Sequence, residues 1–312
     1  MVIFCMALVS FATAIEYLNN SDVVAIPTET VYGLAANGTI NAAVAKIYTL
    51  KNRPQFNPLI MHVPSIDMVE AWANVTPLAH RLVKEFWYKR SASISFVLNL
   101  KDSHPLSLLA LAGLNTVAVR RPNHALALKI LDSLNFPVAA PSANRSNSLS
   151  PTSAQHVLDS LGNDVPVVDG GDCGVGLEST IVDLTHDKIT ILRLGSVTLE
   201  ELTEFGNVDQ ATTGDSIKAP GMLNRHYAPT KHLKMNVLKK EPGMALLGFG
   251  VCQDADLNLS KSSNLIEAAA NLFSYLHTLD DYPFTSIGVS PIPNTGIGEA
   301  INDRLKRACA DG

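Results

Sequence analysis

The stretch "KNRPQFNPLIMH", residues 51–62, contains the change of pattern that decides the fold. It ends a helix-like run, "NAAVAKIYTLK" at 41–51, and begins a strand-like run, "PLIMHV" at 58–63. The first proline of the stretch stops the helix because its ring removes a backbone donor and clashes with the preceding turn. Two cations, Lys51 and Arg53, are therefore expected at the end of a helix and shortly before a strand.

Similar runs on both sides of this stretch predict an α/β protein. Apolar periodicity predicts strands at 23–27, 116–120, 137–140, 166–169, 179–184 and 188–194, and helices at 76–87, 124–134 and 153–162. The last three strands follow one another directly, which favours a mixed sheet over a purely parallel one. The apolar run 1–15 has no preceding cation and is too short to span a membrane. We expect it to form an amphipathic helix on the core of a cytoplasmic protein.

The length of 312 residues favours two domains. The residues after the last strand of the series show no sustained period, which is typical of a linker or a functional loop. A second, smaller α/β unit follows, with strands and helices expected at 244–250, 264–279, 285–292 and 298–309. Asn264 and Glu267 have the spacing of a capping box. The expected parts are a first domain, a linker acting as a lid and a second domain, at 1–205, 206–231 and 232–312.

Charge and cysteine content argue against two classes of function. The net charge is −5, so the chain is not expected to coat nucleic acid, and any anion site must be local. The four cysteines lie far apart without zinc-site spacing, which predicts reduced thiols and no structural metal. For Cys173, in the Gly-rich loop 170–176, an ordinary thiol is favoured over a nucleophile. A strand follows this loop, so it does not match a dinucleotide-binding turn.

Two further polar clusters, 27–34 and 140–152, each follow an expected strand. Ligands of open α/β sheets lie at the carboxyl ends of strands, and loops rich in hydroxyl groups can wrap a nucleotide. Taken alone, each cluster is also compatible with a polar turn or a helix cap. Lys51 and Arg53 could likewise do no more than stabilise the negative end of the helix dipole. The two prolines that fix the segment after Arg53 favour a binding role.

The order of several motifs is more specific than any one of them. The motifs are "PTETVYGLAAN", "KNRPQFNPLIMH", "TVAVRRP", "PVAAPSAN", "SPT", "LESTIVDL" and "ILRLG". Over about residues 20–205 this order resembles the threonylcarbamoyl-AMP synthase family of the Sua5/YrdC type. "APGMLNRHYAP" (219–229) and "IGEAINDRLKRA" (297–308) resemble the linker and the end of the C-terminal domain of the two-domain Sua5 form.

This resemblance implies a fold and a reaction. The fold would be a YrdC-like twisted open mixed sheet with flanking helices, plus a small Rossmann-like α/β C-terminal domain. The activity would be that of an L-threonylcarbamoyladenylate synthase, a nucleotidyltransferase. Such an enzyme makes threonylcarbamoyl-AMP and pyrophosphate from L-threonine, bicarbonate and ATP with Mg²⁺. The product would pass to a tRNA threonylcarbamoyl transferase complex for threonylcarbamoyladenosine (t6A) modification. The carbamate of threonine attacks the α-phosphate, so no protein nucleophile is needed.

The resemblance also assigns site residues by motif. The K-x-R and S-x-N signatures correspond to a catalytic tetrad of Lys51, Arg53, Ser142 and Asn144. The expected ATP contacts are Arg53, Asn57, Thr116, Ser142, Ser150, Arg193 and Tyr227. The expected threonine contacts are Thr30, His62, Arg120, Ser179 and the backbone of Ala140, and the Mg²⁺ ligands stay unassigned. Arg120 would pair with the carboxylate, Thr30 and Ser179 would bind the hydroxyl, and His62 would contact the amino acid or stabilise the carbamate.

The chain departs from the family pattern in one main place. Members usually read "FWPGPLT" where this chain reads "FWYKRSASISFVLNL" (86–100), and the usual Gly before "SPT" is also missing. Either a different loop replaces the Pro-Gly-Pro turn or local order and activity are reduced. For Lys89 and Arg90, a solvated loop is favoured over added positive potential at the rim of the site.

Two other functions are weighed against the synthase. An RNA-binding module of the YrdC fold, without adenylate-forming activity, is the first, and weak RNA binding is retained as an expectation. The acidic net charge and the absence of interleaved aromatic and basic residues argue against it as the main function. The second is a carbamoyl-transfer relative that acts on carbamoyl phosphate. Such proteins carry extra zinc-finger and acylphosphatase-like domains, which are not expected in this sequence.

Overall fold

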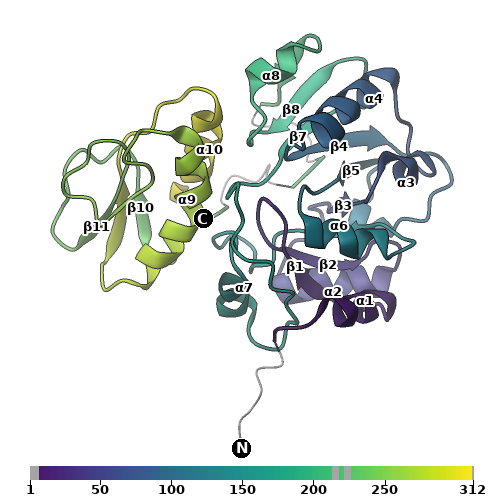
Figure 1. Cartoon of the computed structure of the whole chain (residues 1–312), viewed down its shortest axis with the longest axis horizontal. Coiled ribbons are helices and arrows are strands. Elements are labelled where there is room, and N and C mark those ends of the chain that lie inside the picture. Colours follow the sequence, from purple (N-terminus) through teal and green to yellow (C-terminus); the bar gives the residue numbers. More distant parts are fainter. Residues whose placement is uncertain (1–6, 213–217, 221–225, 311–312) are drawn as a thin grey trace, which may run out of the picture.

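The computed structural model describes residues 7–212, 218–220 and 226–310, which form two sheets with flanking helices (Figure 1). The larger unit contains a nine-stranded sheet of order β1-β2-β6-β3-β5-β4-β7-β8-β9. Its strands are β1 (Val24–Ile26), β2 (Gly33–Asn37), β3 (Ile60–His62), β4 (Ile94–Asn99), β5 (Thr116–Arg120), β6 (Val138–Ala139), β7 (Thr180–Asp183), β8 (Ile189–Arg193) and β9 (Val208–Gln210). Its helices are α1 (Phe11–Asn19), α2 (Asn41–Lys51), α3 (Ile66–Glu70), α4 (Pro77–Val83), the π-helical η1 (Lys84–Lys89), α5 (Leu108–Leu111), α6 (Ala125–Asp132), α7 (Ala154–Leu161) and α8 (Leu199–Thr203).

The sheet is mixed, as predicted. β3 pairs in parallel with β5, β4 with β7 and β8 with β9, and the other neighbours pair antiparallel. β9 was not predicted, because it lies where the sequence shows no sustained period. Its parallel pairing extends the sheet of the larger unit to Gln210.

The predicted bounds of α2 and β5 are confirmed, whereas two other expectations are wrong and one strand was not predicted. The helix expected at 1–15 begins instead at Phe11, where the Ser10 side chain caps it, and residues 1–6 lie outside the described part of the chain. β2 was missed because all five of its residues are buried and show no alternation. The strand expected at 166–169 is reduced to isolated bridges at Val167. None of the described helices is both long and apolar enough to cross a membrane.

The smaller unit (green to yellow in Figure 1) is a parallel sheet with two helices. It contains β10 (His232–Lys234), β11 (Met244–Gly248), β12 (Leu257–Asn258), β13 (Ser286–Val289), α9 (Leu265–Asp281) and α10 (Ile297–Cys309), with strand order β10-β13-β11-β12. This is the Rossmann-like arrangement that was predicted. Its apolar core includes Val31, Leu149 and Leu177 of the larger unit, so the two units pack against each other.

The capping box expected at the start of α9 is only half formed. The Asn264 side chain accepts hydrogen bonds from the N–H groups of Ile266 and Glu267. The Glu267 carboxylate does not return to the Asn264 N–H, as a capping box requires, but accepts from Ser260 and Ser262. The Asn264 N–H donates to Ser260 Oγ instead, so one serine replaces the reciprocal bond.

Alternation along the central strands creates one face that is suited to a site. Residues such as Met61, Phe96 and Val119 join the main core on one side. The other side carries a small apolar cluster of Ile60, Val97, Ala118, Ile181 and Ala219. Side chains two positions apart share a face of a strand. His62 and Arg120 therefore point to the same side as this cluster.

Candidate active site

The expected site residues gather around one cavity on this face. It is lined by Thr28, Val31, Gly33, Arg53, Ile60, His62, Arg120, Ala140, Pro141, Ser142, Glu178, Arg193, Pro220, His226 and Tyr227. Seven of these were predicted, and the other seven predicted residues are all buried. Pro220, His226 and Tyr227 come from the expected linker, so these three described residues of that segment line part of the cavity.

The K-x-R and S-x-N signatures meet through Lys51. Its Nζ donates to the backbone carbonyls of Ser142 (2.6 Å) and Asn144, and lies 3.4 Å from Asn144 Oδ1. Lys51 is 1% exposed, and this burial, with Arg53 nearby, lowers its pKa well below the ordinary value. Lys51 therefore holds the S-x-N loop in place and is not itself part of the cavity lining.

Arg53 lines the cavity because of the turn that follows α2. Asn52 ends the helix in the left-handed conformation, with φ 50°. The chain then returns so that Arg53 donates to the carbonyls of Asn57 (3.3 Å) and Pro58 (3.0 Å). Two backbone acceptors thus fix the planar guanidinium, which suits it to bind phosphate oxygens. The Asn57 Oδ1 atom is buried and has no hydrogen-bond partner among the described residues.

The carboxyl ends of β3 and β5 place His62 beside Arg120 in register. Arg120 Nη2 donates to Glu29 Oε1 (2.7 Å) and to Thr30 Oγ1 (2.8 Å). Burial lowers the pKa of His62 to about 3, and Arg120 contributes to the shift. The imidazole is therefore neutral near pH 7, which favours a hydrogen-bonding contact to the amino acid over a cationic carbamate stabiliser.

Glu29 was not predicted as a site residue, although it lies within a polar cluster that was noted. Burial alone would raise the pKa of Glu29, but the Arg120 charge and hydrogen bonds hold it below the usual range. Glu29 Oε2 and Arg120 Nε are both buried and have no hydrogen-bond partner in the part of the chain that the structure describes. This ion pair therefore keeps one acceptor and one donor unused at the predicted threonine side.

Ser179 and Arg193 connect β7 and β8 at the cavity. Arg193 donates to the Ser179 carbonyl (3.1 Å) and to Ser179 Oγ (3.2 Å). The Ser179 hydroxyl also lies 2.8 Å from Ser95 Oγ. Thr116 lies at the opposite end of β5 from Arg120, about 13 Å away at the usual rise per residue. The predicted contacts thus extend along the strand.

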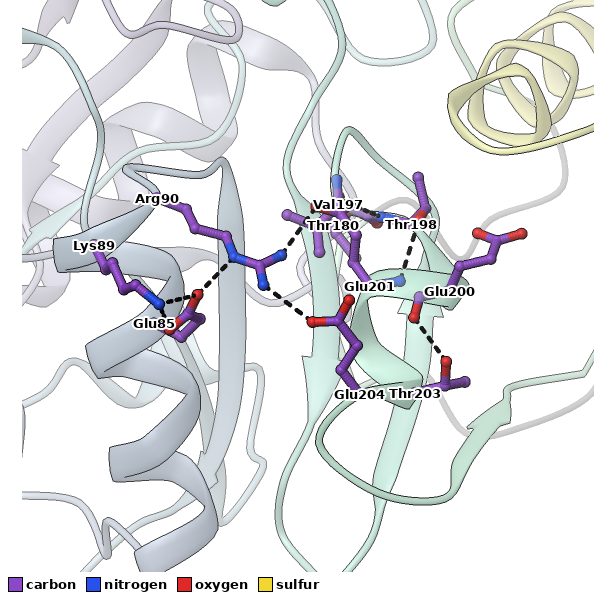
Figure 2. A network of polar contacts seen from close by, with 10 residues as sticks. All are labelled: Glu85, Lys89, Arg90, Thr180, Val197, Thr198, Glu200, Glu201, Thr203 and Glu204. Carbon is purple, nitrogen blue, oxygen red and sulfur yellow. Dashed lines mark hydrogen bonds and ion pairs between the residues drawn. The ribbon is translucent and has the colours of Figure 1, made fainter.

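Ion pairs connect the atypical segment to α8, as Figure 2 shows. Arg90 pairs with Glu85 (2.7 Å), Glu201 (3.3 Å) and Glu204 (3.1 Å), so it connects η1 to α8. The expectation of a solvated loop is therefore wrong for Arg90. The Lys89 side chain is 73% exposed and therefore solvated, although Lys89 is the last residue of η1 and not part of a loop.

Ser93 links the same segment to the cavity. Its hydroxyl donates to Glu29 Oε1 at 2.7 Å, and its carbonyl accepts from the Thr180 N–H at 3.0 Å. Ser93 is 3% exposed. The segment that lacks the Pro-Gly-Pro turn thus contributes a buried hydroxyl to the carboxylate that holds Arg120.

Two kinds of reactive group were considered from the sequence, a nucleophilic thiol and a set of metal ligands. Cys173 is buried, and burial raises the pKa of its thiol to about 12, which agrees with an ordinary thiol. Among the residues that the structure describes, no group of three or more His, Cys, Asp or Glu side chains could hold a metal ion.

Glu178 and His226 line the cavity but were not predicted, although each is adjacent in sequence to a predicted residue.

Comparisons with known proteins agree with this geometry. Two family models match the chain: "Telomere recombination" (Sua5_yciO_yrdC) at 16–195, and "Threonylcarbamoyl-AMP synthase, C-terminal domain" at 197–310. Threonylcarbamoyl-AMP synthases of Bacillus subtilis and Pyrococcus abyssi are 36% and 37% identical, each over 95% of this chain and 92% of the relative.

Solved structures give the same result. The crystal structure of P. abyssi Sua5 complexed with L-threonine has a TM-score of 0.87 and 34% identity, covering 96% of this chain and 94% of that one. Escherichia coli YciO, 19% identical with a TM-score of 0.53, covers 62% of this chain and 92% of its own, and shares the fold of the larger unit alone. The chain therefore belongs to the threonylcarbamoyl-AMP synthase family, in its two-domain Sua5 form.

Proposed function

We propose that the chain is an L-threonylcarbamoyladenylate synthase, which makes threonylcarbamoyl-AMP and pyrophosphate from L-threonine, bicarbonate and ATP. One observation carries the proposal: Arg120, the predicted carboxylate partner, and Arg53, a predicted phosphate partner, line the same cavity. The names of the relatives and the threonine bound to the P. abyssi protein support it.

The threonine half of the site would form around Arg120. The Nε of Arg120, which has no partner among the described residues, would supply a donor for the substrate carboxylate, while Nη2 donates to Glu29. Thr30 and Ser179 supply hydroxyl groups for the side chain of threonine. A pocket that hydrogen-bonds a substrate hydroxyl discriminates strongly against analogues without one.

The nucleotide half would use Arg53, Arg193 and Ser142 of the cavity wall. The carbamate oxygen of the substrate attacks the α-phosphorus, the bond to the bridging oxygen breaks, and pyrophosphate leaves. The arginines would stabilise the charge on the phosphates. Glu29 and Glu178 are both engaged by arginine, so we propose that Mg²⁺ is held mainly by the triphosphate that it accompanies.

We further propose that the product is consumed by a tRNA threonylcarbamoyl transferase in the cytoplasm. No observation favours the alternative of an RNA-binding module. The cations Lys51, Arg53, Arg120 and Arg193 are at most 9% exposed, so they do not form a basic surface for RNA.

The test is pyrophosphate release from ATP, Mg²⁺ and bicarbonate with threonine, with serine or without an amino acid. Release that depends on threonine, with serine weaker, is expected. Release that is independent of the amino acid, or RNA binding without any pyrophosphate release, would contradict the proposal.

A further inference from the structure

The smaller unit inserts one arginine into the larger unit. Arg304, on α10, is 1% exposed although it is charged. Its Nε donates to Glu178 Oε2 at 2.9 Å, its Nη2 to the Leu194 carbonyl at 2.7 Å and its Nη1 to Asp303 at 2.8 Å. A buried guanidinium needs hydrogen-bond acceptors for its N–H groups. Two of the three acceptors of Arg304, Glu178 and the Leu194 carbonyl, belong to the larger unit.

Glu178, which receives this arginine, itself lines the cavity. Its second oxygen, Oε1, accepts a hydrogen bond from the hydroxyl of Ser150, a predicted ATP contact. Both carboxylate oxygens are thus occupied by protein donors. Burial would raise the pKa of Glu178, but the charges of Arg304 and Arg193 outweigh it, so the carboxylate stays ionised. An ionised carboxylate whose two oxygens are both hydrogen-bonded is suited to orienting Ser150 and Arg304, and poorly suited to acting as a general acid or base.

Tyr227, another predicted ATP contact, is held from the same side. The Arg304 guanidinium lies 5.1 Å from the centre of its ring, and the ring of Phe273 on α9 lies 5.6 Å away. The Tyr227 backbone has φ 64°, a conformation that residues with a side chain adopt only when the surroundings impose it. The smaller unit supplies much of those surroundings.

We propose that Arg304 is a positioning residue for ATP: it fixes Ser150 through Glu178, fixes Tyr227 by ring contact, and anchors the carbonyl next to Arg193. Arg304 is not among the residues that line the cavity, so it acts through these neighbours. The inference rests on the proposed assignment of Ser150, Arg193 and Tyr227 to ATP. It gives the smaller unit a defined part in a site whose predicted polar contacts all come from the larger unit and the linker.

The experiment compares four variants: Arg304→Gln, Arg304→Lys, the double variant Arg304→Gln/Glu178→Gln, and Lys306→Ala as a control. Lys306 lies on the same helix and is exposed. ATP binding is measured by calorimetry, and pyrophosphate release gives KM for ATP and for threonine separately. Circular dichroism and thermal unfolding establish that each variant is folded.

Arg304→Gln should weaken ATP binding by about tenfold or more, the usual effect of losing a hydrogen bond to a charged group, with the threonine KM within about twofold of wild type. Arg304→Lys should recover part of the loss. The double variant should bind ATP better than Arg304→Gln, because no carboxylate without its arginine partner remains at the cavity wall. Lys306→Ala should match the wild type.

Wild-type ATP affinity in folded Arg304→Gln would overturn the inference. So would an equal rise of both KM values, which indicates general loosening of the structure. If Arg304→Gln does not fold, Arg304→Lys decides: unchanged ATP affinity overturns the inference, and weaker affinity with unchanged threonine KM supports it. Because ATP affinity is measured without turnover, failure of threonine-dependent pyrophosphate release would count against the proposed function alone.

Discussion

Two arginines, Arg90 and Arg304, each join distant elements through carboxylates, but in different surroundings. The Arg90 side chain is 32% exposed and meets three glutamates at the surface (Figure 2). The Arg304 side chain is 1% exposed and pairs with Glu178, which lines the cavity. Water screens the first network, so its pairs contribute little, whereas removing one partner of the second leaves an uncompensated buried charge. The number of ion pairs is therefore a poor guide to importance, and burial is a better one.

The largest effect is expected from removing Glu178. Glu178→Ala leaves Arg304 charged and buried, which should lower the free energy of unfolding by about 3–5 kcal/mol in urea titrations. Glu204→Ala is the matched control, because Glu204 is a 60% exposed partner of Arg90. Equal losses in the two variants would show that burial does not distinguish the networks.

The next effect concerns pH, because the buried region also contains neutral histidines. Burial lowers the pKa of His62 and of His226 to about 3, from an ordinary value of 6.5. Between about pH 6.5 and pH 3 these histidines are protonated in the unfolded chain but neutral in the folded chain. The free energy of unfolding should therefore fall as the pH is lowered through this range. The slope should approach about 1.4 kcal/mol per pH unit for each histidine.

His156 provides a way to check this slope. Its pKa is lowered to about 4 by burial and by His277, whose ring stacks on it at 3.9 Å. Urea unfolding at pH 7, 6 and 5 should show a shallower decline in His156→Asn than in the wild type. A parallel decline in the two proteins would contradict the assignment.

A smaller effect is expected at Ser93. Ser93→Ala removes a donor from Glu29 and loosens the pair with Arg120, which should raise the KM for threonine by about tenfold and leave the KM for ATP near the wild-type value. Ser91→Gly, at an exposed position of the same segment with φ 51°, is the control. An unchanged threonine KM would mean that the atypical segment does not act on the site.

The smallest effect is expected from Arg90→Gln. Activity should stay within about twofold of wild type, and the unfolding midpoint should move little, because exposed pairs are screened by water. The measurement is pyrophosphate release together with thermal unfolding. A loss as large as that of Glu178→Ala would remove the distinction between the two arginines.

The sequence predicts best where one period dominates. α2 and β5 have the predicted bounds, and Lys51 of the K-x-R signature contacts Ser142 and Asn144 of the S-x-N signature. β2 is buried on both faces and shows no alternation, and β9 depends on pairing with β8, which its own residues cannot encode. Local patterns fail where tertiary contacts decide.

The same limit applies to the site. Glu178 and Arg304 lie 126 residues apart, and no short motif links them. Glu29 was visible as part of a polar cluster, but its role depends on Arg120, which is 91 residues away. The sequence could therefore indicate the residues that are proposed to bind the substrates, whereas the groups that hold those residues became visible only in the folded chain.

The most direct test of the account separates the two halves of the cavity. Arg120→Gln and Arg53→Gln are compared by steady-state pyrophosphate release, with threonine and ATP varied in turn. The account predicts a higher KM for threonine in Arg120→Gln and a higher KM for ATP in Arg53→Gln. If both variants affect the same substrate, or if neither KM changes, the assignment of threonine and ATP to these two arginines is wrong.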